Sequence, residues 1–262
     1  MADNDKREQL AALCKKLHIS SHMAELGTVM GDDANQDFLC RLFEAEVEHR
    51  HKERISGFLN AAAFPRRYVP EQFHTEEIDF PDEVSFQSLL DLDFYKAGRN
   101  VIMYGGTGTG KTMLSILIGI SACSQEVPVR FFRTAALINQ FTTHYKKGSL
   151  DQFKKKLNTA GIIILDEFGY VPYDRTGSQL LFDYLSEIHE LKSVILNTNL
   201  EFAQWVNVLY DPKMTTALIG RLTHHVELIL FPGTNYRLKE SSINEAFARM
   251  NRKPTNKKSI VN

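Results

Sequence analysis

One stretch limits the fold of this chain more than any other: residues 100–115, NVIMYGGTGTGKTMLS. An apolar run of β-forming residues precedes a glycine-rich segment, and an apolar helical pattern follows it. Two glycines five residues apart, followed by Lys and a hydroxyl residue, form the P-loop pattern, whose backbone N–H groups can surround a phosphate. The next helix presents its positive N-terminal end to the same anion. The sequence therefore predicts a strand–loop–helix nucleotide site made by Gly105, Gly106, Thr107, Gly108, Thr109, Gly110, Lys111 and Thr112.

A second motif follows about 55 residues later, where GIIILDE covers residues 161–167. Four apolar residues followed by two acids are typical of a buried strand that ends in an acidic pair. We expect Asp166 to hold Mg²⁺ together with the Thr112 hydroxyl, while Lys111 reaches the outer phosphates. Glu167 can then polarise a water molecule for attack on the γ-phosphate. Together the two motifs predict nucleotide hydrolysis rather than binding alone.

Further polar residues follow later strands. An amide after the run that begins at Val194 could orient the attacking water; we favour Asn199, with Asn197 as the alternative, although an Asn there could also cap a turn. Arg221 and Arg237 could stabilise γ-phosphate charge, from a neighbouring subunit or from the same one, or could simply be surface residues.

Other candidates carry weaker signals. His224 and His225 have no acidic partner at ligand spacing, so we interpret them as structural. The residues of an adenine pocket cannot be selected from the sequence, although Phe80, Phe94 or Tyr95 could line it.

Alternation of short apolar runs with helical patterns predicts an α/β fold, with a parallel sheet flanked by helices. The ligand should lie at the carboxyl ends of the strands, where the glycine-rich loop is. The predicted strands are Val101–Tyr104, Val129–Phe132, Ile162–Leu165, Val194–Asn197 and Val226–Leu230.

The chain divides into four predicted regions. Residues 1–69 form a small all-helical N-terminal domain for partner, DNA or self-association, with a long helix over 35–63. The apolar stripe of that helix is Phe38, Leu39, Leu42, Phe43, Ala45 and Val47. Residues 70–98 form an acidic linker, 99–248 the ATPase domain, and 249–262 a basic tail that we expect to be disordered.

With these motifs in place, the chain resembles the IstB-like branch of the AAA+ ATPases, the insertion-sequence transposition helpers related to DnaC-type helicase loaders. The resemblance runs from about Gln9 to Lys239. Its most specific stretches are LCRLFEAEVEHR (39–50), TNLEFAQW (198–205), IGRLTHH (219–225) and TNYRLKES (234–241). One departure is Ile188-His189-Glu190, where relatives often carry Arg-Tyr-Glu.

The resemblance implies ATP and Mg²⁺ as ligands, with residues 105–112 as Walker A and Asp166 and Glu167 as Walker B. It implies Asn199 as sensor 1, Arg221 as a finger acting on the neighbouring subunit, and Arg237 as sensor 2. It also implies a homo-oligomer on duplex DNA, with ATP at subunit interfaces, that delivers the DNA to a cognate transposase. The alternative within this resemblance is a helicase loader that binds single-stranded DNA.

A basic segment offers a surface for DNA. Residues 130–157 contain seven Lys or Arg and one acid, on two predicted helices joined near Gly148. Such charges give salt-dependent, sequence-independent affinity, although an ordinary solvated face has the same pattern. The candidate DNA-binding residues are Arg133, Lys146, Lys147, Lys154, Lys155 and Lys156; the tail adds five more positive residues.

Composition narrows the remaining classes. The chain of 262 residues is 43% hydrophobic, which is enough for a real core, but no apolar run is long enough to span a bilayer. The start is polar and the three cysteines are far apart, so we expect a cytoplasmic protein without disulfides or membrane contact. A small-molecule P-loop kinase and a nucleotide-gated scaffold without turnover remain as other function classes.

Overall fold

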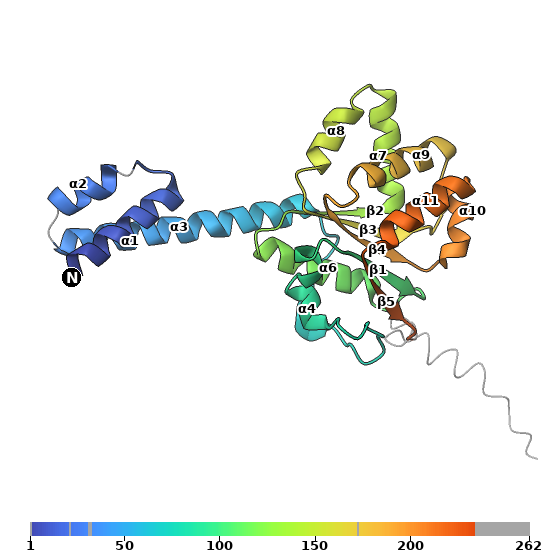
Figure 1. The fold of residues 1–262 in the computed structure, drawn as a ribbon, viewed down its shortest axis with the longest axis horizontal. Coiled ribbons are helices and arrows are strands. Elements are labelled where there is room, and N and C mark those ends of the chain that lie inside the picture. Colours follow the sequence, from blue (N-terminus) through green and yellow to red (C-terminus); the bar gives the residue numbers. More distant parts are fainter. Residues whose placement is uncertain (1, 21, 31–32, 172, 234–262) are drawn as a thin grey trace, which may run out of the picture. The chain divides into compact units, whose positions relative to one another are not determined.

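The computed structural model describes residues 2–20, 22–30, 33–171 and 173–233 (Figure 1). The chain divides into two compact units, Met1–Asn60 and Ala61–Asn262. Among the described helices, none combines the length and the apolar character that crossing a bilayer requires. The predicted basic tail, residues 249–262, lies outside the described residues.

The described residues of the first unit form three helices: α1 (Ala2–Leu17), α2 (His22–Met30) and α3 (Asp33–Ala62), whose last residues belong to the second unit. The helical content predicted for this region is confirmed. A small buried cluster joins the three helices through Leu10, Leu13, Cys14, Ala24 and Cys40.

The apolar stripe of α3 is narrower than predicted. Leu39, Phe43 and Val47 pack against the buried cluster, whereas Phe38 and Leu42 are 59% and 50% exposed. Residues four apart lie on one face of a helix, and each neighbour in sequence is turned by about 100°. Helices α1 and α2 cover only the face that carries Leu39, Phe43 and Val47. The prediction was therefore wrong for Phe38, Leu42 and Ala45, which are exposed.

The second unit begins with short elements: η1 (Pro70–Gln72), α4 (Phe86–Leu90) and α5 (Asp93–Lys96). Five strands follow: β1 (Asn100–Gly105), β2 (Val129–Arg133), β3 (Ile162–Phe168), β4 (Ser193–Thr198) and β5 (Val226–Phe231). The intervening helices are α6 (Lys111–Ser124), α7 (Thr134–Lys146), α8 (Leu150–Leu157), α9 (Arg175–Glu187), η2 (Phe202–Trp205), α10 (Val206–Leu209) and α11 (Pro212–Thr223).

The strands form one parallel sheet in the order β2-β3-β4-β1-β5, and all five predicted strands are confirmed. An additional antiparallel bridge joins Asp79 to Leu230, where each backbone N–H donates to the carbonyl of the other. The acidic segment before β1 is therefore tied to the edge strand β5.

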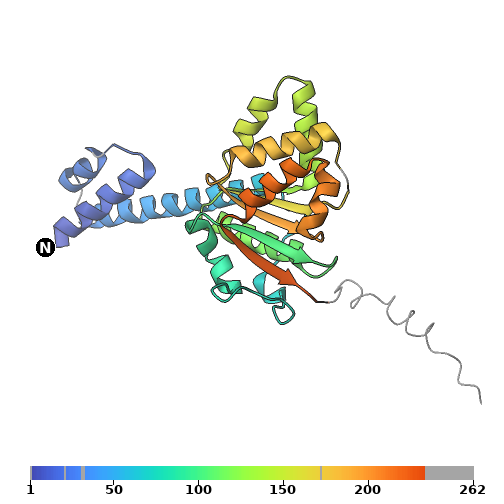
Figure 2. The ribbon, with the colours of Figure 1, turned by 45° about the vertical axis from the view of Figure 1, so that its right-hand side comes forward.

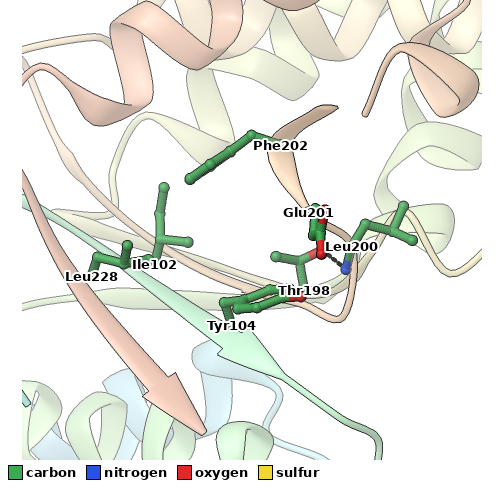
Figure 3. Close-up of a pocket in the computed structure, with 7 residues that line it drawn as sticks. All are labelled: Ile102, Tyr104, Thr198, Leu200, Glu201, Phe202 and Leu228. Carbon is green, nitrogen blue, oxygen red and sulfur yellow. Dashed lines mark hydrogen bonds between the residues drawn. The ribbon is translucent and has the colours of Figure 1, made fainter. Parts of the chain in front are cut away.

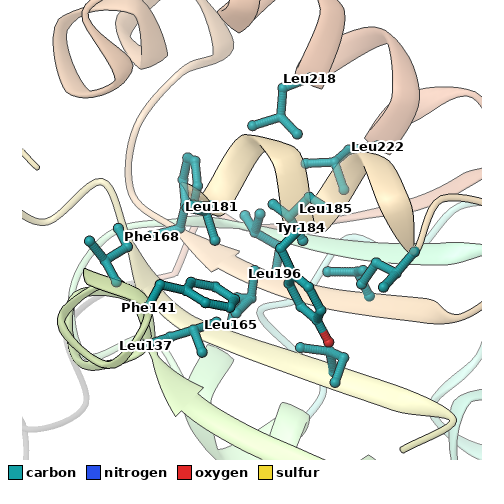
Figure 4. Close-up of a cluster of buried hydrophobic side chains, with 14 of the residues drawn as sticks. Leu137, Phe141, Leu165, Phe168, Leu181, Tyr184, Leu185, Leu196, Leu218 and Leu222 are labelled. Atoms are coloured by element: carbon teal, nitrogen blue, oxygen red, sulfur yellow. The ribbon is translucent and has the colours of Figure 1, made fainter. Parts of the chain in front are cut away.

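Helices cover both faces of the sheet: α6 lies on one face, and α7, α9 and α11 lie on the other (Figures 1 and 2). Side chains on a strand alternate between faces, and β3 shows this directly. Ile163 and Leu165 belong to the cluster shared with α7, α9 and α11, whereas Ile164 contacts α6 at Gly119. Figure 4 shows that cluster, with Tyr184 of α9 among its leucines. These two layers fix the carboxyl ends of the strands in place.

The basic segment folds into two helices, α7 and α8, joined through Gly148 at φ 66°, as predicted. The rings of Phe141 and His144 contact Phe153, with centroids 5.4 and 4.5 Å apart, so the two helices pack against each other. His144 Nδ1 lies 2.8 Å from Ser149 Oγ and helps to close the turn.

Candidate nucleotide site

The glycine-rich loop connects β1 to α6 at the carboxyl edge of the sheet. Gly108 and Gly110 have φ values of 78° and 105°, which side chains with a Cβ rarely adopt. A Cβ on Gly105 would collide with the Phe231 backbone on β5. Gly110 is also the N-cap of α6 and supplies no side-chain cap, so the N–H groups of the first turn remain available to an anion.

Lys111 is held inside this loop. Its Nζ donates to the carbonyls of Gly105 and Gly106 at 2.8 and 2.6 Å, and it lies 3.3 Å from Thr109 Oγ1. The ammonium therefore sits among the groups that would surround a phosphate, and exchanging these carbonyls for phosphate oxygens requires only a short movement of its flexible stem.

Three side chains from three elements meet beside the loop. Thr112 Oγ1 donates to both oxygens of Asp166, at 3.0 and 3.1 Å. Asn197 Nδ2 donates to Asp166 Oδ1 at 2.8 Å and to Ser115 Oγ at 2.9 Å. Asp166 is only 4% exposed. A hydroxyl beside a buried carboxylate is the oxygen donor set that Mg²⁺ prefers, so Thr112 and Asp166 fit the ion predicted for them.

The sheet register explains this meeting. Arg133 pairs with Asp166 across β2 and β3, and Leu165 pairs with Leu196 across β3 and β4. Asn197 therefore reaches the end of β3 from within the neighbouring strand. Its Oδ1 is buried and has no hydrogen-bond partner within the described residues, so one acceptor of this amide remains unused.

The two amides considered for water orientation lie in different environments. Asn197 is 1% exposed and contacts Asp166, whereas Asn199, the favoured candidate, is exposed and follows the last residue of β4. The structure thus brings the alternative, Asn197, into the cluster and leaves Asn199 outside it.

Glu167 points away from its neighbour Asp166. A register shift interrupts the pairing of β3 with β4 between Leu165 and Phe168, and Glu167 has a φ of 56°. Its side chain is 47% exposed, and Glu167 Oε2 lies 3.6 Å from Arg133 Nε. The strand end thus separates a buried carboxylate, suited to a metal, from an exposed one, suited to accepting a proton from water.

Hydrogen bonds hold this strand end in its bent path. Thr134 Oγ1 donates to the Asp166 carbonyl at 2.9 Å, and Thr198 Oγ1 donates to the Phe168 carbonyl at 3.0 Å. Gly169 N–H donates to Tyr173 Oη at 2.8 Å. Burial raises the pKa of Tyr173 to about 12, so this phenol stays neutral as an acceptor at physiological pH.

Arg221 lies in the last turn of α11, two residues before the final residue of this helix, Thr223. Its guanidinium carbon is 5.2 Å from the centre of the Phe182 ring on α9, and its Nη1 is buried with no hydrogen-bond partner in the part of the chain that the structure describes. Because α11 leads into the start of β5, its last turn lies toward the sheet edge opposite the glycine-rich loop. Arg237, the other predicted arginine, lies outside the described residues.

The candidate DNA-binding residues separate into two groups. Lys146, Lys147, Lys155 and Lys156 are exposed on the α7–α8 hairpin. Lys154 is only 18% exposed, and its Nζ donates to Glu187 at 2.7 Å. Arg133 faces Glu167, as described above.

Of the three aromatic residues considered for an adenine pocket, Phe94 and Tyr95 lie away from the loop, and the suggestion of Phe80 stays a prediction. Phe94 is buried in the core, and Tyr95 contacts Gly161, just before β3 begins, at the opposite edge from the loop. Phe73 instead approaches Gly110: a Cβ built there would lie 3.4 Å from its ring. Phe73 also stacks on Phe86 at 5.3 Å. Several aromatics share this acidic segment, so composition alone could not single it out.

A separate apolar cavity of about 120 Å³ lies near the carboxyl ends of β1, β4 and β5 (Figure 3). Ile102, Tyr104 and Phe202 face it, beside Thr198, whose Oγ1 accepts from the Leu200 N–H. No residue of the glycine-rich loop lines this cavity. It is therefore distinct from the phosphate-binding arrangement.

Comparisons with solved structures agree with this geometry. AMPPCP-bound DnaA from Aquifex aeolicus superposes with a TM-score of 0.54 and 17% identity, over 74% of this chain and 62% of that one. The DnaC helicase loader superposes with a TM-score of 0.50 and 17% identity, over 66% and 98%. At this identity the likeness shows the fold alone, which is that of the AAA+ proteins.

Sequence comparisons identify the family. A protein of Pseudomonas aeruginosa described as ATP-binding and belonging to insertion sequence IS21 is 32% identical over 235 residues, 89% of each chain. A Geobacillus stearothermophilus protein with the same description, from IS5376, is 29% identical over 91% of this chain and 97% of its own length. The family model described as "IstB-like ATP binding protein" matches residues 9–244. The chain is therefore a member of the IstB-like ATP binding protein family and has an AAA+ fold.

Proposed function

We propose that this chain is a Mg²⁺-dependent ATPase that assembles on duplex DNA, delivers that DNA to the transposase of its insertion sequence, and stimulates the transposase. The observation that carries the ATPase part is the cluster of Thr112, Asp166 and Asn197 beside a loop that already encloses the Lys111 ammonium. Kinship with insertion-sequence proteins supports the transposition part. Both substrates, ATP and DNA, imply action in the cytoplasm.

In the proposed reaction, the loop N–H groups and Lys111 bind the β- and γ-phosphates, and Thr112 and Asp166 hold Mg²⁺. The ion would neutralise phosphate charge. Asn197, through its free Oδ1, or Asn199 positions the attacking water, and Glu167 accepts its proton. The water oxygen bonds to the γ-phosphorus as the bond to the β–γ bridging oxygen breaks, which yields ADP and inorganic phosphate.

Arg221 completes the site from a neighbouring subunit in this proposal. Its position toward the edge opposite the loop supports action on another protomer's nucleotide rather than on its own. A guanidinium supplied in trans stabilises transition-state charge and is typically worth three to five orders of magnitude in rate. ATP-dependent assembly and hydrolysis would then depend on the same contact.

The α7–α8 hairpin is the proposed DNA contact. Its exposed lysines can neutralise phosphates on a duplex without reading bases, which suits a helper that accepts many target sequences.

The direct test measures the ATPase rate per subunit against protein concentration, with and without duplex DNA and with and without a chelator. We expect the rate to rise with both concentration and duplex, and to vanish on Mg²⁺ removal. A rate per subunit that does not change with protein concentration, duplex DNA or the chelator would contradict the proposal. Lys111→Ala should lose nucleotide binding, whereas the matched surface variant Lys96→Ala should retain it.

Helicase loading is the second candidate, favoured by the fold likeness to the DnaC helicase loader. Affinities for single- and double-stranded DNA at matched salt discriminate the two functions. Preference for single strands, together with capture of a hexameric helicase, would favour the loader.

A further inference from the structure

Two histidines and a glutamate meet at the sheet edge opposite the glycine-rich loop. His189 and Glu190 lie in the turn between α9 and β4, and His224 follows the last residue of α11. His189 Nε2 is 3.6 Å and His224 Nδ1 is 3.8 Å from the same atom, Glu190 Oε1. One ligand atom from each residue lies within 4.8 Å of the other two, the only such His/Cys/Asp/Glu group among the described residues.

We propose that His189, Glu190 and His224 form a zinc-binding site. Two imidazole nitrogens and one carboxylate oxygen are a common protein ligand set for Zn²⁺, with the fourth position left to water or another donor. Ligand atoms at about 2.0–2.2 Å from a tetrahedral ion lie roughly 3.4 Å apart. The two separations from Glu190 Oε1 are close to that spacing, and all three ligand atoms already lie within 4.8 Å of one another, so side-chain rotations can bring them around an ion.

The backbone that carries these ligands is fixed by hydrogen bonds to β1. Asn100 Oδ1 accepts from Val194 N–H at 2.9 Å, and Asn100 Nδ2 donates to the Leu222 carbonyl at 3.2 Å. The Asn100 N–H also donates to the His225 carbonyl at 2.8 Å. A single buried asparagine thus joins the start of β4 to the end of α11, and the ligands lie within five residues of those contacts.

The α9–β4 turn has further support. Lys192 Nζ donates to the carbonyls of Asn158 and Ala160, and Leu191 N–H donates to the Ile188 carbonyl. Glu190 itself has a φ of 63°, a conformation that a non-glycine residue adopts at a cost. That conformation aims its carboxylate between two imidazoles from different turns. Exposed contacts of this kind contribute little to stability, so a bound ligand is the stronger reason for the convergence of these three side chains.

The ligands are close together in the fold although they are far apart in the sequence. Glu190 lies 34 residues before His224 in the sequence, and the parallel sheet brings the two together. A metal ion here would join the ends of α9 and α11, one helical turn from Arg221. It would therefore steady the helix end that carries the proposed interface arginine.

The test uses the full chain, stripped with a chelator and free of nucleotide, in buffer with millimolar Mg²⁺ to occupy oxygen-only sites. Zn²⁺ binding is followed by calorimetry, and Co²⁺ substitution by its visible absorption. The cysteines of the chain are all buried, so thiolates should not compete. We expect one Zn²⁺ per chain and the absorption of a tetrahedral Co²⁺ complex.

Three variants remove one ligand each: His189→Ala, Glu190→Gln and His224→Ala. Each should weaken Zn²⁺ binding at least about tenfold, the loss already seen when supporting residues of metal sites are changed. His49→Ala removes an exposed histidine on α3, outside the ligand set, and should leave binding unchanged. Equal metal-free melting temperatures establish that the variants are folded. Absence of stoichiometric binding to the unaltered chain, or equal binding by ligand and control variants, would overturn the proposal.

Discussion

At the scale of single residues, Asn197 gives the most specific prediction, because its side chain joins β4 to the Asp166 carboxylate at the end of β3. Asn197→Ala removes a hydrogen bond to a charged group, which is typically worth about 1.5–3 kcal/mol. We expect ATP hydrolysis to fall roughly tenfold to a hundredfold. Steady-state phosphate release measures this change.

Asn199→Ala is the matched control, because it removes the same side chain from an exposed position two residues away. Hydrolysis by that variant should stay close to that of the unaltered chain. If Asn199→Ala loses activity while Asn197→Ala keeps it, the exposed amide is the sensor and the assignment favoured from the sequence holds.

Arg133 gives a second prediction at this scale. Its guanidinium lies 3.6 Å from the Glu167 carboxylate. Because both side chains are exposed, the contact adds little to stability. We expect Arg133→Ala to leave the melting temperature unchanged and to raise DNA-free ATP turnover, because Glu167 is then released toward the attacking water. If Arg133 instead contacts DNA, the variant lowers duplex affinity and the salt slope by about one unit and leaves basal turnover alone.

Sequence patterns identified most of these residues, for reasons that are local. The glycine positions, Lys111 and Thr112 follow from the loop's own geometry, and Asp166 follows from an apolar strand that ends in acids. The choice between Asn197 and Asn199 was not local. Side chains alternate between the two faces of a strand, so Asn197 and Asn199 would point to the same face if β4 continued. The strand ends at Thr198, and Asn199 therefore lies beyond the sheet.

At the scale of elements, the α7–α8 hairpin carries a prediction with an internal control. Lys155 and Lys156 are exposed on α8, whereas the adjacent Lys154 is paired with Glu187. The double variant Lys155→Ala/Lys156→Ala should weaken duplex binding and reduce the salt slope by up to about two units. Lys154→Ala should change both much less. Fluorescence anisotropy at several salt concentrations measures the slopes, and equal effects would contradict this surface.

The hairpin also shows what periodicity can and cannot predict. Apolar spacing and Gly148 predicted both helices and their junction, because those signals lie within the segment. The partner of Lys154, Glu187, lies 33 residues away on α9. The sequence pattern could not show that Lys154 is paired with it, because the pair forms only in the folded chain. On α3, similarly, the exposure of Phe38 and Leu42 depends on which face α1 and α2 cover.

At the scale of the whole molecule, the parallel sheet separates two groups of residues for which we propose functions, one at each end of its strands. The glycine-rich loop, Asp166 and Asn197 occupy the carboxyl edge, whereas the His189–Glu190–His224 group and the last turn of α11 occupy the other. The five strands were predictable from apolar runs, but the order β2-β3-β4-β1-β5 rests on pairings between distant segments. That order sets which residues approach one another from different strands.

In the proposed assembly, each nucleotide is hydrolysed by groups of two neighbouring protomers. Mixing two inactive variants tests this directly. Glu167→Gln should bind ATP and present Arg221 but lack the proton acceptor, whereas Arg221→Ala should bind ATP and keep Glu167 but lack the finger. Nucleotide binding by each variant alone is the control, together with the phosphate release that each produces separately.

An equal mixture should hydrolyse ATP although neither variant does so alone, reaching about a quarter of the unaltered rate if neighbours assort at random. Such recovery requires that one protomer's arginine serve another's nucleotide. A mixture no faster than the sum of its separate components, while both variants bind ATP and assemble, would contradict the shared site.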